Sequence, residues 1–107
     1  MKKGDIVLVR YPFTDLSSEK LRPALVLLPE DKDGDVLLAF ITSTFIIKNP
    51  FDIQLMKGAT GLHKDSILRL RKIMAVHKSL ILGKIGDVSA EQWSTIEVTL
   101  RKMFEFL

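Results

Sequence analysis

The dipeptide Arg22–Pro23 stands directly before the apolar run of residues 24–28, and it is the stretch of this sequence that most directly suggests chemistry. Proline fixes its own φ and pushes the preceding residue toward extended geometry, so the Arg22 side chain leaves the backbone in a restricted direction. A planar guanidinium donates two parallel hydrogen bonds to phosphate oxygens and stays charged at any working pH. Two interpretations follow: an oriented phosphate-binding group, or a charge that keeps the entry of an apolar strand soluble.

Two other pairs of residues suggest chemistry. Arg69 and Arg71 alternate within the segment SILRLRKI, and the two-residue period of a strand puts them on one face. There they could follow the phosphates of a nucleic acid, or they could be surface arginines in ion pairs. His63 and His77 could form an acid–base pair, but one falls in an expected loop and the other at the end of an apolar strand. We therefore favour structural or surface roles for both histidines.

The composition limits the classes of protein that fit. A chain of 107 residues is long enough for one domain with its own core. It has no cysteine, which excludes disulfides, zinc–thiolate sites and thiol nucleophiles and favours the reducing cytoplasm. The longest apolar run, residues 36–41, is far short of the roughly 20 residues that cross a bilayer. The formal net charge of +3 is a modest bias toward polyanions or an acidic protein partner.

The first 88 residues are dominated by short segments rich in Val, Ile and Leu, separated by turn signals. These predicted strands cover residues 5–11, 22–28, 35–42, 51–55, 66–76 and 83–88. Six strands in so small a chain predict a curled sheet or a small barrel. Residues 24–28 and 36–41 are apolar at successive positions, so we expect these two strands to be covered on both faces and to form the centre.

The hydrophobic period changes after Ser89 to the stripe of an amphipathic helix, formed by Trp93, Ile96, Leu100, Met103 and Leu107. Ser89 is a suitable N-cap, Gln92 completes a capping box, and Val88 can pack against Trp93 as a hydrophobic staple. We expect Trp93 to belong to the core rather than to stack on a nucleobase. The chain is thus predicted to be a single domain over residues 1–107, with a β-barrel about 4–88 and a helix about 89–106.

Four blocks of the sequence resemble, in order, the MazF/PemK family of toxin–antitoxin ribonucleases. The segment GDIVLVRYPFTDLSSEKLRPALVLL resembles the family's opening, which has Gly-Asp, an apolar strand, a polar loop and Arg-Pro before a second strand. DVLLAFITST resembles its third strand, which ends in threonine, and DSILRLRKIMAVHKSLILGKIGDVS resembles its later strand block and Gly-Lys-Ile-Gly turn. A terminal helix follows in both. Ordered blocks over almost the whole chain are much more specific than Arg-Pro alone.

The resemblance implies a mainly β fold, an SH3-like small curled barrel of the MazF/CcdB-like toxin type with a C-terminal amphipathic helix. It also implies a cytoplasmic homodimer that acts as a sequence-selective endoribonuclease, an mRNA interferase, on single-stranded RNA. Cleavage would use the RNA's own 2′-hydroxyl, with no metal and no cofactor, and an acidic antitoxin would hold the enzyme in check. By motif position the catalytic residues are Arg22 and Thr42.

Chemistry gives these two residues distinct tasks. Arg22 suits the stabilisation of a phosphorane whose oxygens gain charge, and its high pKa makes it a poor proton shuttle. The Thr42 hydroxyl could hold a phosphate oxygen or the attacking group, or it could simply bond the backbone at a strand end. Thr44 shares a strand face with Thr42, whereas Ser43 points away, and both stay candidates for RNA contact.

The loop FTDLSSEKL departs from the family pattern, because it lacks the Gly-rich element after the acidic residue and is shorter. In the family this loop covers the active site, so Ser18, Glu19 and Lys20 are candidates for RNA contact, with solvated loop residues as the alternative. The departure also keeps a second class of function open: a degenerate toxin relative or a non-catalytic SH3-like module that binds a protein or a nucleic acid.

Overall fold

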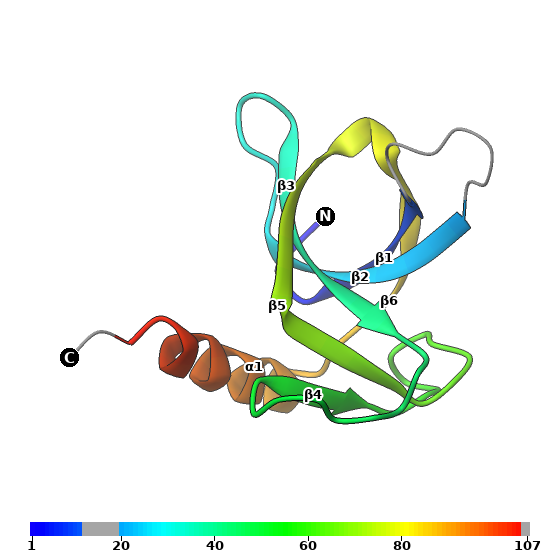
Figure 1. Cartoon of the computed structure of the whole chain (residues 1–107). Helices are drawn as coiled ribbons and strands as arrows, with labels where there is room; N and C mark the ends of the chain where they lie inside the picture. The colour runs from blue at the N-terminus through cyan, green and yellow to red at the C-terminus, as the bar shows by residue number, and fades with distance from the viewer. Residues whose placement is uncertain (12–19, 106–107) are drawn as a thin grey trace.

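A computed structural model describes residues 1–11 and 20–105 of the chain. Six strands form one antiparallel sheet in the spatial order β4-β5-β3-β2-β1-β6. The elements are β1 (Asp5–Tyr11), β2 (Lys20–Leu28), β3 (Asp35–Thr42), β4 (Asp52–Leu55), β5 (Ser66–His77), the 3₁₀ turn η1 (Lys78–Leu80), β6 (Ile81–Asp87) and α1 (Ala90–Met103). Figure 1 shows the sheet curling into a ring, with α1 outside it. The predicted curled sheet of six strands and a terminal helix is confirmed.

The strands β2 and β3 occupy the middle of the sheet, as their apolar sequences predict. Ala24 to Leu27 are all buried, whereas Leu28, the last residue of the predicted run, is 49% exposed. Alternate residues of these strands belong to two apolar clusters. The helix-side cluster includes Leu25 and Ala39, and the inner cluster includes Val26 and Leu38. Both faces of the central strands are therefore covered, one of them by α1.

The helix α1 begins at the capping box that the sequence predicts. The Ser89 hydroxyl accepts the Gln92 backbone N–H at 3.1 Å, and the Gln92 side-chain oxygen accepts the Ser89 N–H at 2.8 Å. Ile96 is fully buried in the helix-side cluster, and half-buried stripe residues, Trp93 among them, pack around it. Trp93 thus belongs to the core, while Leu107 lies outside the described residues. Within the described chain, no helix is long and apolar enough to cross a membrane.

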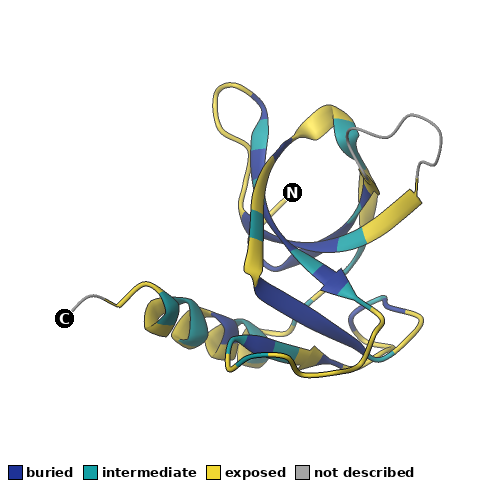
Figure 2. Ribbon diagram, in the orientation of Figure 1, coloured by how far each residue is buried: buried dark blue, intermediate teal, exposed yellow. Residues whose placement is uncertain are grey.

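The long strand β5 bends sharply at its middle (Figure 1). One step along β3, from Ala39 to Phe40, corresponds to four steps along β5, from Ile73 to Arg69. The residues of β5 before the bend are buried and most of those after it are exposed (Figure 2). The two-residue alternation of side chains therefore does not continue across residues 70–72, and the bend sets which side chains of β5 face inward.

The first strand, β1, lies between β2 and the last strand, β6. Its residue Asp5 connects β1 to β6 and to the N-terminal segment. The Asp5 carboxylate accepts the Lys2 backbone N–H at 2.8 Å and lies 3.3 Å from the Lys84 ammonium of β6. Burial alone would disfavour the charged carboxylate, but the Lys2 N–H and Lys84 more than offset this. The pKa of Asp5 therefore lies below its ordinary value.

We expect Asp5→Asn to lower the free energy of unfolding at pH 7 by about 1 to 3 kcal/mol, because Lys2 and Lys84 lose a charged acceptor. Since the native pKa of Asp5 is lowered, its contribution is complete above the unfolded-state pKa of about 3.9 and is lost as the pH falls through the native value. Urea unfolding of both proteins at neutral pH and near pH 3 should show the difference shrinking in acid. An equal difference at both pH values would contradict this account.

Candidate functional site

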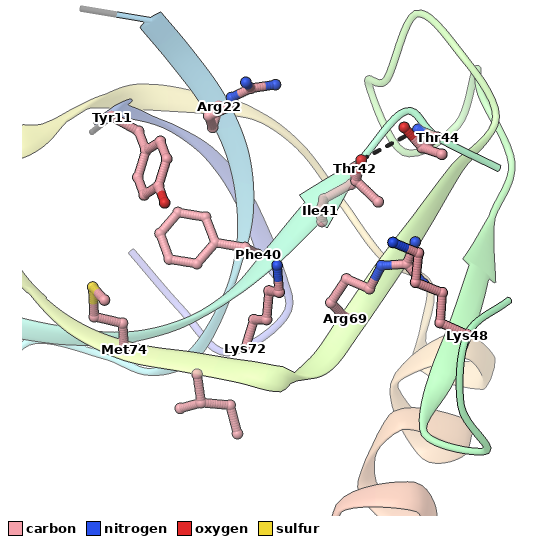
Figure 3. A pocket seen from close by; sticks show the side chains of 11 residues that line it. Tyr11, Arg22, Phe40, Ile41, Thr42, Thr44, Lys48, Arg69, Lys72 and Met74 are labelled. Carbon is pink, nitrogen blue, oxygen red and sulfur yellow. Dashed lines mark hydrogen bonds between the residues drawn. The ribbon is translucent and has the colours of Figure 1, made fainter. Parts of the chain in front are cut away.

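A cavity of about 540 Å³ opens beside the bend of β5, between β1, β2 and β3. Figure 3 shows the side chains around it. They are Tyr11, Arg22, Phe40, Ile41, Thr42, Thr44, Lys48, Arg69, Lys72, Ile73 and Met74. These residues come from four strands and the loop after β3, so the cavity exists only when the sheet is curled.

Both residues predicted to be catalytic, Arg22 and Thr42, line this cavity. The pairing of β2 with β3 sets Ala24 opposite Phe40, and Arg22 and Thr42 each lie two residues beyond this pair on their strands. Arg22 is exposed, and among the described residues its guanidinium has no hydrogen-bond or ion-pair partner. It therefore presents a whole, uncompensated charge at the cavity that Thr42 also lines.

The Thr42 hydroxyl oxygen accepts the backbone N–H of Thr44 at 3.2 Å, shown as the dashed line in Figure 3. This is the backbone bond expected of a strand-end threonine, and it fixes the position of the oxygen while its own hydrogen stays available to donate. Thr44 also lines the cavity, whereas Ser43 is exposed and does not. The cavity lining thus includes Thr42 and Thr44 but not Ser43, although β3 ends at Thr42, so the strand alternation used for the prediction does not extend to Thr44.

Arg69 and Arg71 do not share a face, so the simple two-residue period was wrong for this segment. Arg69 is only 7% exposed and lines the cavity, while Arg71 is exposed and lies outside it. The cause is the bend of β5, which interrupts the alternation between these positions. Lys72, at the bend, is the other basic residue of β5 that lines the cavity.

Arg69 is held by a buried acid from the neighbouring strand, Asp52. One oxygen of the Asp52 carboxylate, Oδ2, accepts a hydrogen bond from Arg69 Nη1 and also the backbone N–H groups of Lys48, at 2.7 Å, and Asn49, at 3.3 Å. The other oxygen, Oδ1, is buried with no hydrogen-bond partner. Arg69 is thus in an ion pair, as the alternative interpretation from the sequence proposed. The pair is buried and borders the cavity, whereas that interpretation placed it at the surface.

The cavity combines positive charge with an apolar surface. Of the described residues that line it, four are basic and none is acidic. The rings of Tyr11 and Phe40 lie 5.6 Å apart, tilted by 55°, and Met74 lines the same cavity (Figure 3). Proteins that bind single-stranded nucleic acid combine cations, which contact the phosphates, with aromatic side chains, on which the bases stack. The lining of this cavity offers both.

Several of these residues were not identified from the sequence: Tyr11, Phe40, Lys48, Lys72 and Met74. Each looks ordinary where it stands, an aromatic or methionine within a strand or a lysine in a polar stretch. Only the curl of the sheet, which brings four strands around one space, reveals their common position. Of the loop candidates, Ser18 and Glu19 lie outside the described residues. Lys20 is exposed at the start of β2 and does not line the cavity.

Neither histidine lines the cavity. His63 is exposed in the loop between β4 and β5. His77 caps the turn η1, because its Nδ1 accepts the Ser79 backbone N–H at 3.1 Å. A structural or surface role was expected for both histidines. The structure shows a capping role for His77 and a surface position for His63. In the described part of the chain, no three His, Asp or Glu side chains gather as metal ligands would.

Comparison with known proteins identifies the fold and the family. The chain is similar to the Mycobacterium tuberculosis toxin MazF-mt6, with a TM-score of 0.74 and 20% identity over 94% of this chain and 95% of that one. It is also similar to an endoribonuclease in complex with its cognate antitoxin from a mycobacterial species, with a TM-score of 0.76 and 16% identity over 100% and 99% of the two chains. These structures confirm the predicted toxin fold.

No curated protein sequence matches the chain. The family model of PemK-like, MazF-like toxins matches residues 2–104, almost the whole chain, and so includes every residue of the cavity. The chain belongs to the PemK-like, MazF-like toxin family of type II toxin–antitoxin systems.

Proposed function

We propose that this toxin is an endoribonuclease that cleaves single-stranded RNA in the cavity beside the bend of β5. The observation that carries the proposal is the cavity lining: among the described residues it has four cations and no acid, it contains the aromatic pair Tyr11–Phe40, and both Arg22 and Thr42 belong to it. Two structurally similar mycobacterial proteins are described as endoribonucleases, which supports the same activity here.

Cleavage proceeds by attack of the RNA's own 2′-oxygen on the adjacent phosphorus. A bond from the 2′-oxygen to phosphorus forms, the bond from phosphorus to the 5′-oxygen breaks, and the 2′-proton leaves as the 5′-oxygen gains one. The products are a 2′,3′-cyclic phosphate and a 5′-hydroxyl, and no protein nucleophile or metal takes part. The enzyme's task is to align the phosphate and to stabilise its developing charge.

The residues of the cavity divide this task. Arg22, exposed and unpaired within the described structure, donates its planar pair of N–H groups to the oxygens that gain charge. Thr42, whose oxygen is fixed by Thr44, donates its hydroxyl hydrogen to a phosphate oxygen. The rings of Tyr11 and Phe40 offer a surface on which a neighbouring base can lie.

We further propose a homodimer in the cytoplasm that is held inactive by a cognate acidic antitoxin. One structurally similar endoribonuclease forms a complex with its antitoxin, and an acidic segment would complement the basic cavity. Phe45, Ile46 and Ile47, between 43% and 58% exposed, follow directly after the cavity residue Thr44. A twofold partner that covers this apolar loop would bring the cavity to the dimer seam. Light scattering at micromolar concentration should give twice the mass of the chain, and a monomer would count against the dimer.

The function is tested by incubating the pure protein with a long RNA, with and without a chelator, and mapping the new ends. We expect cuts at preferred sequences that persist in chelator and leave 5′-hydroxyl ends. A preparation carrying Arg22→Ala, purified identically, controls for contaminating nucleases. Cuts that vanish with chelator would contradict the mechanism. No cuts at excess protein over many RNAs would favour a non-catalytic binding module instead.

A further inference from the structure

The buried acid next to the cavity, Asp52, needs an explanation, because an acid beside a polyanion site opposes binding. Its side chain is fully buried, and one carboxylate oxygen has no hydrogen-bond partner. A buried charge with an unsatisfied oxygen lowers the stability of the fold. A role of Asp52 in the site would offset this loss. The same carboxylate contacts two segments that carry cavity cations, Arg69 on β5 and the backbone at Lys48.

We propose that Asp52 is a positioning residue for RNA binding, which holds the guanidinium of Arg69 so that its free N–H groups face the phosphate. This inference rests on the function proposed above. Asp52 contacts no substrate; it acts through Arg69. A guanidinium has five N–H donors, and the Asp52 bond uses Nη1. Arg69 lines the cavity, and none of its nitrogens is both buried and unpaired.

The geometry favours an Arg69 whose guanidinium is fixed by Asp52 on one side and is available to a phosphate on the other. The Arg69 side chain is only 9% exposed, so its position is set by packing as well as by Asp52. A long cation that already has a single orientation loses less side-chain entropy when a phosphate binds. By contrast, Lys48 and Lys72 are exposed in the described structure and approach the ligand as mobile point charges. Arg69 is therefore the cation best able to set the register of the RNA.

The proposal and simple electrostatics predict opposite signs for one substitution. Asp52→Asn removes a negative charge near a polyanion site, so long-range attraction alone would tighten RNA binding. If Asp52 positions Arg69, the same change should weaken binding, because a neutral amide oxygen holds the guanidinium less firmly than a carboxylate does. The amide oxygen can still accept the Lys48 and Asn49 N–H groups, so the loop keeps its attachment.

Asp5→Asn is a matched control. Asp5 is also a buried acid, 5% exposed, that accepts a backbone N–H and pairs with a cation, but it does not line the cavity. Both variants lose one buried negative charge. They differ in position relative to the cavity and in the cation they release, a half-exposed lysine for Asp5 and a nearly buried arginine for Asp52.

The experiment measures how tightly each variant binds an RNA over a range of salt concentrations. The 2′-hydroxyl at the cleavage site of this RNA is replaced by hydrogen, so that it is bound but not cut. The concentration of folded protein is the same for every variant. We expect Asp52→Asn to weaken binding about tenfold, the scale of coupling between contacting charged groups. The slope of log affinity against log salt should fall by about 0.7, the value for one lost phosphate contact on a single strand. Asp5→Asn should bind as well as the wild type. Equal or tighter binding by Asp52→Asn, with an unchanged slope, would overturn the proposal.

A second comparison covers the case in which Asp52→Asn alone fails to fold. Removing both charges of a buried pair is usually tolerated better than removing one, so Asp52→Asn with Arg69→Gln should fold. If Asp52 acts through Arg69, this double variant binds RNA no more weakly than Arg69→Gln alone. Additional weakening in the double variant would contradict the proposal. Wild-type protein that neither binds nor cuts RNA would instead contradict the proposed function, so the two failures are distinguishable.

Discussion

Replacing Arg22 with alanine should lower the rate of RNA cleavage at least about a hundredfold, the usual scale for losing a preorganised donor that stabilises developing charge. The variant should fold as the wild type does, because Arg22 is exposed and has no partner among the described residues. Arg22→Lys should recover only a small part of the activity, because a point charge lacks the planar pair of N–H groups. Single-turnover cleavage of each variant, measured beside its thermal melt, checks both statements.

Arg101→Ala is the matched control for Arg22→Ala. Arg101 is an exposed arginine on α1 that does not line the cavity and pairs at the surface with Glu97 at 3.1 Å. It should keep wild-type cleavage and lose at most a few tenths of a kcal/mol of stability. If Arg22→Ala melts normally and cuts at the wild-type rate, Arg22 is a residue that keeps its strand soluble and has no catalytic role.

Replacing Ile96 with alanine should lower the free energy of unfolding by about 2 to 5 kcal/mol, through lost burial and the cavity left behind. Ile96 is the residue of the α1 stripe that is fully buried, while Leu100 is only half-buried and should cost less. Val98→Ala is the control, because Val98 lies on the same helix but is 50% exposed, and its change should stay within about 0.5 kcal/mol.

Urea unfolding of these helix variants gives the comparison directly. Cleavage per folded molecule should be unchanged in Ile96→Ala, since Ile96 does not line the cavity. A loss of stability no larger than that of Val98→Ala would show that α1 is not packed on the sheet. A large loss of activity in fully folded Ile96→Ala would show that the helix does more than stabilise the fold.

Much of the fold could be predicted from the sequence because it depends on local patterns. The Ser89 capping box and the apolar stripe after it determine where α1 begins and which side it buries. The doubly apolar runs of β2 and β3 identify the middle strands, since only covered strands lack polar alternation. That Arg22 and Thr42 belong to one site was predicted from a motif rather than from a physical rule, and both line the same cavity.

The remaining parts of the site depend on contacts between distant residues. Arg69 and Asp52 are 17 positions apart, and nothing in either segment indicates that the two side chains meet. The two-residue period fails at Arg71 because of the bend of β5. There, three residues of β5 have no partner on β3, although the neighbouring pairs are consecutive on β3. Such irregularities arise from how whole strands fit together, so neither propensity nor periodicity predicts them.

The antiparallel pairing of β1 with β6 also sets the order in which the core can be completed during synthesis. Residues 5–11 are translated well before their outer neighbour, residues 81–87. Until then Ile6 lacks both its pairing with Gly86 and the cluster it shares with Ile96. Contacts so distant in sequence form slowly and late. The strands made first therefore wait without a finished core until β6 and α1 have been made, and the curl that forms the cavity can become stable only then.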